Sequence, residues 1–107
     1  MIFTKNDVIS PQQARRIMKQ TDDFVLLDVR TPSEYRQKRL DGAKLLPVDQ
    51  LEQLALSYLP DKQSAILVYC QSGIRAQNAV KILSRMGYTG VVSFGGITDW
   101  PYETISG

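Results

Sequence analysis

The chain has 107 residues, of which 43% are hydrophobic and 22% are charged, and its formal net charge is +2. This composition excludes disordered and fibrous classes, and the length predicts one domain, residues 1–107, with a single core. The charge is mild, and no run of Lys and Arg is interleaved with aromatic residues, so we do not expect a nucleic-acid partner. One cysteine allows no internal disulfide.

The sequence gives no indication of a membrane partner, because no stretch is long enough to span a bilayer. The first residues also lack the long apolar core of a signal peptide, so we expect a cytoplasmic protein. With one cysteine, no histidine and no glycine fingerprint for phosphate binding, we expect no metal, nucleotide or organic cofactor.

Short apolar runs alternate with helical patterns from the start of the chain. Residues 8–9 predict a short strand, and a Ser-Pro-Gln-Gln pattern at Ser10 predicts a capping box that opens a helix to about Lys19. The next apolar run, residues 24–27, predicts a buried strand that ends at Asp28.

The alternation continues through the middle of the chain. Thr31 and Glu34 repeat the capping-box pattern and predict a short helix. Residues 43–46 predict a brief strand that Pro47 stops. The apolar positions of residues 49–59 recur at helical spacing, which predicts a third helix.

The second half completes the pattern. Residues 65–69 are continuously apolar, which is typical of a strand buried on both faces of a parallel sheet. Helical spacing from Arg75 to Met86 ends at Gly87, and residues 91–94 predict a last strand. We therefore expect an α/β fold of three layers, with a parallel sheet of about five strands and helices on both faces.

A polar loop containing the cysteine follows the strand at 65–69. Its sequence is Cys70-Gln71-Ser72-Gly73-Ile74-Arg75. It lies at the carboxyl end of a strand, where open α/β sheets bind ligands. The unpaired N–H groups and the dipole of the following helix favour a thiolate at Cys70. Gly73 permits positive φ, so that successive amides can form an anion-binding nest.

The loop composition assigns roles to its residues. A lone cysteine is more often a small buried hydrophobe, but the polar residues behind Cys70 make a poor core, so we predict a nucleophile. Arg75 would either grip substrate oxygens or bond loop carbonyls. The four residues between Cys70 and Arg75 are expected to contribute mainly their backbone amides to the site. These residues are Gln71, Ser72, Gly73 and Ile74. Ile74 would also provide an apolar rim.

Charged residues elsewhere are expected near the same sheet edge. Asp28 at the end of its strand would pair with Arg30 or Arg75 and brace the loop from behind. A group of basic residues could steer anions, although a solvated face is the more ordinary interpretation. These residues are Arg36, Lys38 and Arg39.

The loop at 70–75 resembles the active-site loop of the single-domain rhodaneses, the thiosulfate sulfurtransferases. Three other stretches resemble the same family in the same order: Leu27-Asp28-Val29-Arg30-Thr31-Pro32-Ser33-Glu34-Tyr35, then Asp41-Gly42-Ala43, then Gly95-Gly96-Ile97 followed by Trp100. Where many members read Gly-His before Ile-Pro-Gly-Ala, this chain has Lys38-Arg39-Leu40-Asp41 before Gly42-Ala43. The resemblance implies a single rhodanese domain and a rhodanese-like three-layer sandwich.

The resemblance also implies a sulfurtransferase. A thiolate in a nest of amides can attack the outer sulfur of thiosulfate, and sulfite leaves without needing a proton. This chemistry agrees with a chain that contains no histidine. The product would be a Cys70 persulfide. Because the chain has no second cysteine, cyanide, a small thiol or a partner protein's cysteine would remove the sulfur in a ping-pong sequence.

Three alternatives remain open. A persulfide relay to a partner protein shares the first half of the reaction. A phosphatase or arsenate reductase on the same architecture also uses Cys and Arg, but phosphatases that resemble this fold have five residues between them, whereas four separate Cys70 from Arg75. Such an enzyme would also need a general acid for an ester substrate. A non-catalytic binding module of this fold typically lacks the cysteine.

Overall fold

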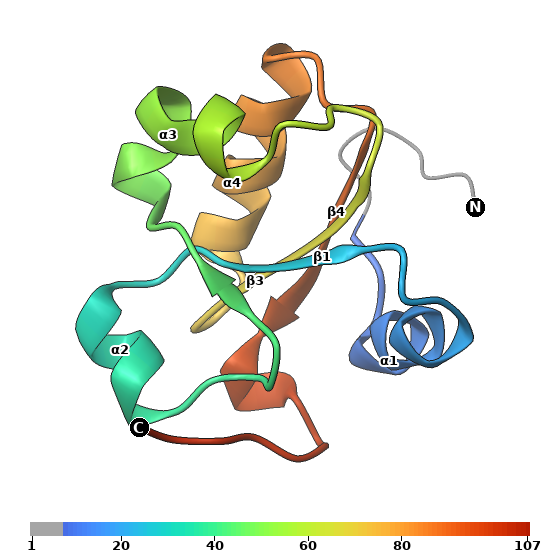
Figure 1. The fold of residues 1–107 in the computed structure, drawn as a ribbon. Helices are drawn as coiled ribbons and strands as arrows, with labels where there is room; N and C mark the ends of the chain where they lie inside the picture. The colour runs from blue at the N-terminus through green and yellow to red at the C-terminus, as the bar shows by residue number, and fades with distance from the viewer. Residues whose placement is uncertain (1–7) are drawn as a thin grey trace.

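The computed structural model describes residues 8–107 and is organised around a parallel sheet (Figure 1). The strands are β1 (Val25–Asp28), β2 (Lys44–Leu45), β3 (Ala65–Cys70) and β4 (Gly90–Gly96), in the order β2-β1-β3-β4. All three neighbouring pairs are parallel, which confirms the predicted α/β class.

Within residues 8–107 the sheet has four strands, where about five were expected. The predicted strand at residues 8–9 is reduced to one bridge, between Val8 and Ser93, with Ile9 N–H donating to the Ser93 carbonyl at 2.8 Å. The chain leaves the sheet at this point because Ser10 already caps the first helix.

Local sequence signals determine where the helices begin. The helices are α1 (Pro11–Gln20), α2 (Pro32–Gln37), α3 (Leu51–Tyr58) and α4 (Ile74–Arg85). Both predicted capping boxes are present, one between Ser10 and Gln13 and the other between Thr31 and Glu34. The third helix is preceded by a 3₁₀ turn, Val48–Gln50.

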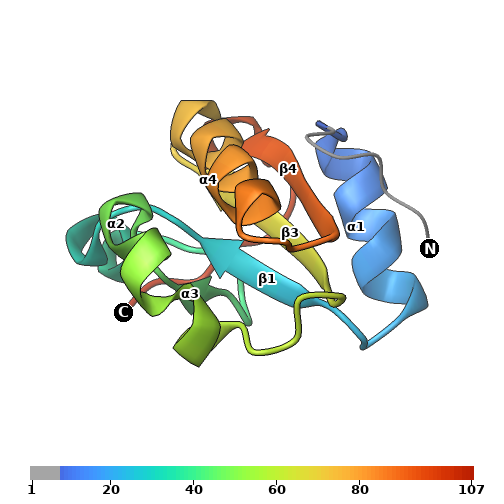
Figure 2. The ribbon, with the colours of Figure 1, turned by 90° about the horizontal axis from the view of Figure 1, so that it is seen from above.

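The helices form layers on the two faces of the sheet, with α1 on one face and α3 and α4 on the other (Figure 2). Alternate residues of each strand pack on opposite faces of the sheet. In β3, Ile66, Val68 and Cys70 pack on the α3 and α4 side, whereas Leu67 and Tyr69 pack on the α1 side. The cysteine therefore lies on the face that α4 covers.

The carboxyl ends of the central strands meet at one edge. Cys70 in β3 is paired with Gly96 in β4, and the loops that follow stay in contact, since Thr98 N–H and Oγ1–H both donate to the Gln71 carbonyl. A Cβ on Gly96 would lie 2.1 Å from that carbonyl oxygen, so a larger residue would displace the cysteine loop.

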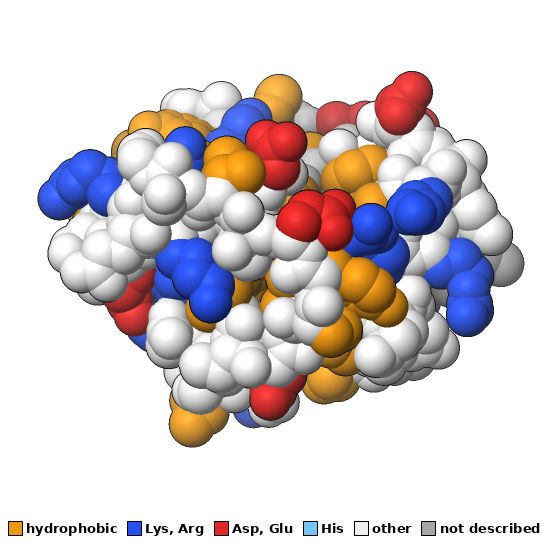
Figure 3. Space-filling view, turned by 90° about the horizontal axis from the view of Figure 1, so that it is seen from below, with side chains coloured by type: hydrophobic (Ala, Val, Ile, Leu, Met, Phe, Trp, Pro, Cys, Tyr) orange, Lys and Arg blue, Asp and Glu red, His pale blue; other side chains and the backbone are white. Residues whose placement is uncertain are grey.

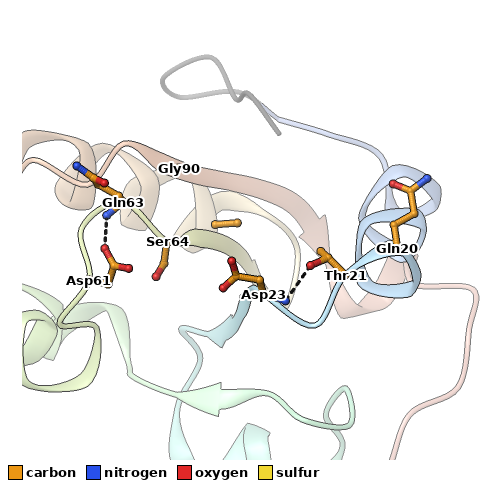
Figure 4. Close-up of a pocket in the computed structure, with 8 residues that line it drawn as sticks. Gln20, Thr21, Asp23, Asp61, Gln63, Ser64 and Gly90 are labelled. Atoms are coloured by element: carbon orange, nitrogen blue, oxygen red, sulfur yellow. Dashed lines mark hydrogen bonds between the residues drawn. The ribbon is translucent and has the colours of Figure 1, made fainter.

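A separate cavity of about 540 Å³ lies at the amino ends of the strands (Figure 4). Its two carboxylates belong to Asp23, just before β1, and Asp61, before β3. Asp61 accepts a hydrogen bond from Gln63 N–H at 2.9 Å, and Asp23 N–H donates to Thr21 Oγ1 at 3.0 Å. The length of β3 separates this cavity from Cys70.

The surface seen in Figure 3 mixes both signs of charge, with Lys and Arg side chains at several separate places and Asp and Glu side chains among them. In the part of the chain that the structure describes, none of the helices has the length and apolar character needed to cross a bilayer. The location predicted from the sequence stays a prediction.

Candidate active site

The Cys70 side chain lies at the end of β3 and is completely buried. Its Sγ accepts hydrogen bonds from two backbone groups, Gly73 N–H at 3.0 Å and Ala76 N–H at 3.3 Å. Ala76 is in the first turn of α4, whose N–H groups have no partner within the helix. The two donors and the helix dipole stabilise negative charge on the sulfur.

The loop between Cys70 and α4 turns sharply at Gly73, which has a φ of 106° and is the N-cap of the helix. This positive φ directs the Gly73 amide to the sulfur. Ile74 follows on the outside of the loop, where it is 71% exposed. Gln71 is half-buried and Ser72 is exposed. Sequence reasoning missed Ala76, which lies beyond the predicted loop.

Arg75 forms a two-pronged ion pair with Glu34 of α2. Its Nη1 donates to Glu34 Oε1 at 2.8 Å and its Nη2 to Oε2 at 2.9 Å. Of the two roles predicted for Arg75, the bond to loop carbonyls is not formed among residues 8–107. The guanidinium pairs with Glu34 instead, because α2 places the carboxylate of its capping box beside the start of α4. Contact between Arg75 and a substrate stays a prediction.

The Glu34 carboxylate interacts with two helices, its own helix α2 and α4. Glu34 accepts hydrogen bonds from Thr31 N–H as part of the capping box, while its charge is paired with Arg75. The hydrogen bonds from Arg75, together with those from Thr31, lower the pKa of Glu34 from 4.5 to about 2, against the effect of burial. The sequence identified the cap but gave no signal of the ion pair.

Asp28 and Arg30 form a buried ion pair behind the loop, with 2.8 Å between Arg30 Nη2 and Asp28 Oδ2. Of the two partners considered for Asp28, the structure thus places Arg30 against it. Arg30 Nη1 also donates to Gln71 Oε1 at 3.1 Å, and Nη2 donates to the Lys38 carbonyl. Burial alone would lower the pKa of Arg30, but Asp28 raises it. The pair thereby connects β1 to the cysteine loop.

Tyr69, on the α1 side of the sheet, is a further residue that interacts with the Asp28–Arg30 pair. Its hydroxyl accepts a hydrogen bond from Leu40 N–H at 3.1 Å. Burial, and then the Asp28 carboxylate, raise the pKa of the phenol, so Tyr69 stays neutral. Among residues 8–107, no three His, Cys, Asp or Glu side chains gather in a way that could hold a metal ion.

Comparisons with known proteins agree with this arrangement. Residues 10–102 match the family described as the Rhodanese-like domain. Thiosulfate sulfurtransferase PspE of Escherichia coli is 36% identical over 81 residues, which are 76% of this chain and 78% of PspE. A solved structure described as a rhodanese with anions from E. coli is 33% identical, has a TM-score of 0.70, and is matched over 78% of this chain and 98% of that chain. The chain therefore belongs to the rhodanese-like family, which confirms the resemblance seen in the sequence.

The family domain also occurs within longer proteins. The probable adenylyltransferase/sulfurtransferase MoeZ of Mycobacterium tuberculosis is 32% identical over 98 residues, which are 90% of this chain and 25% of MoeZ. This chain thus corresponds to about a quarter of that relative.

Proposed function

We propose that this chain is a sulfurtransferase that carries sulfur as a persulfide on Cys70. The observation that supports this function best is the Cys70 Sγ at the end of β3, which accepts hydrogen bonds from Gly73 N–H and Ala76 N–H. The relatives named as a thiosulfate sulfurtransferase and a rhodanese support thiosulfate as the sulfur donor.

In the first step, the Cys70 thiolate attacks the outer sulfur of thiosulfate. A bond forms between Sγ and that sulfur, while the sulfur–sulfur bond of thiosulfate breaks and its electron pair leaves with sulfite. Sulfite is a stable anion, so the step requires no general acid. The amides that hold the thiolate also lie near the charge of the resulting persulfide.

In the second step, an external nucleophile takes the outer sulfur and regenerates the Cys70 thiolate. The chain contains no second cysteine that could do this. Cyanide, a small thiol or a cysteine of a partner protein would serve, and Ile74, exposed on the loop, would contact the acceptor. A relay to a partner protein differs from the small-molecule reaction only in this step.

The loop spacing favours sulfur transfer over phosphate ester hydrolysis. Four residues separate Cys70 from Arg75, one fewer than in the phosphatases that resemble this fold, and the shorter loop encloses a smaller space. A binding module would have no use for a sulfur that accepts two amide hydrogen bonds. We therefore keep the phosphatase and the binding module only as possible outcomes of the test below.

The test is transfer of sulfur from thiosulfate to cyanide by the wild type and by Cys70→Ser, with an aryl phosphate assayed in parallel. We expect thiocyanate formation with ping-pong kinetics, complete dependence on Cys70, and no phosphate release. Phosphate release without thiocyanate would support the phosphatase, and turnover by Cys70→Ser would show that the nucleophile is wrongly assigned.

A further inference from the structure

The connecting stretch between α2 and β2, residues 38–40, reaches the surroundings of the cysteine from two sides. The Lys38 carbonyl accepts a hydrogen bond from Arg30 Nη2 at 2.6 Å. The Leu40 N–H donates to the hydroxyl of Tyr69, the residue directly before the cysteine, at 3.1 Å. The place of this stretch therefore affects two side chains that adjoin the cysteine loop.

The Arg30 side chain connects this stretch to the loop itself. Arg30 is only 2% exposed, and its guanidinium is bonded to the Asp28 carboxylate, the Lys38 carbonyl and Gln71 Oε1. Gln71 directly follows Cys70. Because the N–H groups of a guanidinium have fixed directions in one plane, a shift at one acceptor changes the bonds to the others. A displaced Lys38 carbonyl would therefore change how Gln71 is held.

The centre of the connecting stretch is paired with the last residues of the sequence. Arg39 N–H donates to the Ile105 carbonyl and Ile105 N–H donates to the Arg39 carbonyl, both at 2.8 Å, in an antiparallel bridge. Gly107 N–H donates to the Arg36 carbonyl at 2.8 Å, so residues 105–107 run beside the end of α2 (Figure 1). These residues hold the connecting stretch from the outside.

The Arg39 side chain adds to this pairing. Its Nη1 donates to the Gly107 carbonyl at 3.0 Å and to the Tyr35 carbonyl at 3.3 Å, and its guanidinium lies 4.6 Å from the centre of the Tyr35 ring. Within residues 8–107, Ile105 belongs to neither hydrophobic core and is 37% exposed. Its backbone hydrogen bonds therefore hold the connecting stretch in place and do not add to the burial of a core.

We propose that Ile105, although it lies outside the active site, is a positioning residue for Cys70. It acts through the connecting stretch and the Arg30 guanidinium, which hold the residue after Cys70. The inference rests on the proposed function and extends it to the control of the loop geometry. If the bridge to Ile105 is lost, the loop amides shift relative to Sγ, and a misplacement of about 1 Å can slow a reaction on the order of 100-fold.

The test compares two substitutions at the same position. Ile105→Pro removes the N–H that donates to the Arg39 carbonyl, whereas Ile105→Ala, the matched control, keeps it. Ile105→Pro should lower the limiting rate of persulfide formation from thiosulfate about tenfold and leave the half-saturating concentration within about twofold, because the nucleophile is misplaced. Ile105→Ala should stay within about twofold of the wild type in both. Urea unfolding gives the folded fraction of each variant, so that rates are compared per folded protein.

The NMR signals of the Gly73 and Ala76 amides, which both donate to Sγ, provide a second measurement. These signals should shift in Ile105→Pro and stay in place in Ile105→Ala, a difference that lower stability alone would not produce. If Ile105→Pro does not fold, Arg39→Met takes its place, since it removes the side-chain bond to the carbonyl of residue 107. Its control is Arg36→Met on the exposed side of α2, and Arg39→Lys should restore the rate.

The outcomes separate the two proposals. A wild type that forms no persulfide would refute the proposed function, while shifted Gly73 and Ala76 signals in Ile105→Pro alone would still support Ile105 as a positioning residue for the loop. Persulfide formation by the wild type, with equal limiting rates in Ile105→Pro and Ile105→Ala, would overturn the positioning role and leave the proposed function intact.

Discussion

The ion pair between Glu34 and Arg75 should make the stability of the fold depend on pH in a defined window. Glu34→Gln removes the charge but keeps a side-chain oxygen for the Thr31 cap and for Arg75. Because the hydrogen bonds from Arg75, and then those from Thr31, lower the pKa of Glu34 from 4.5 to about 2, the carboxylate stabilises the folded state fully above pH 4.5. That contribution is lost as the pH falls from about 4.5 towards about 2.

The size of the effect follows from the same pKa. Taken alone, the change from 4.5 to about 2 would correspond to about 3 kcal/mol. The side chains of Arg75 and Glu34 are 34% and 28% exposed, so solvent weakens their interaction. We therefore expect Glu34→Gln to lower the free energy of unfolding by about 1–2 kcal/mol at pH 7.

Urea unfolding at pH 7, 4 and 2.5 would measure this difference. We expect the free energies of unfolding of the wild type and Glu34→Gln to converge as the pH falls. Glu52→Gln provides the control, since it removes a carboxylate from the exposed side of α3. A difference between wild type and Glu34→Gln that stays constant across this range, or that Glu52→Gln reproduces, would refute the reasoning.

Other substitutions test the support of the loop. Asp28→Asn should destabilise the fold by about 3 kcal/mol in urea unfolding, because it leaves a buried guanidinium without its counter-charge. Gly96→Ala should reduce thiosulfate turnover at least about tenfold, since the added Cβ would meet the cysteine loop, and it should cost about 1–3 kcal/mol of stability. A glycine inserted between Ser72 and Gly73 should impair sulfur transfer measured with cyanide, because the widened loop withdraws an amide from the sulfur.

Each of these expectations has an outcome that contradicts it. An Asp28→Asn variant as stable as the wild type would show that the buried pair adds nothing. For Gly96, the comparison is Gly95→Ala, whose Cβ would meet nothing within 4 Å although its φ of 93° disfavours alanine. Equal loss of turnover in both glycine variants would point to backbone strain instead of contact with the loop. Unchanged sulfur transfer in the lengthened loop would discredit the argument from loop size.

Features set by neighbouring residues could be predicted from the sequence. A capping box needs a hydroxyl and a carboxylate or amide three residues apart, and the boxes at Ser10 and Thr31 were both found this way. The strand before Cys70 was predicted from its continuous apolar run, and the family's motifs indicated the fold. The strand at residues 8–9 was overestimated, because two apolar residues do not show how soon the chain turns into α1.

Contacts between distant residues could not be predicted. Glu34 and Arg75 are 41 positions apart, and only the packing of α2 against the start of α4 brings them together. The contact of Gly96 with the Gln71 carbonyl depends likewise on the register of β3 and β4. Neither pair is marked by a local sequence pattern. The sequence therefore indicated only a helix cap at Glu34 and a turn at Gly96, whereas in the structure both residues support the cysteine loop.

The most direct test of the central claim is the intact mass of the protein after treatment with thiosulfate in the absence of an acceptor. We predict that the wild type gains the mass of one sulfur atom, that Cys70→Ser gains none, and that cyanide removes the added sulfur. A wild type that gains no mass, or a Cys70→Ser variant that gains as much, would contradict the assignment of Cys70 as the sulfur carrier.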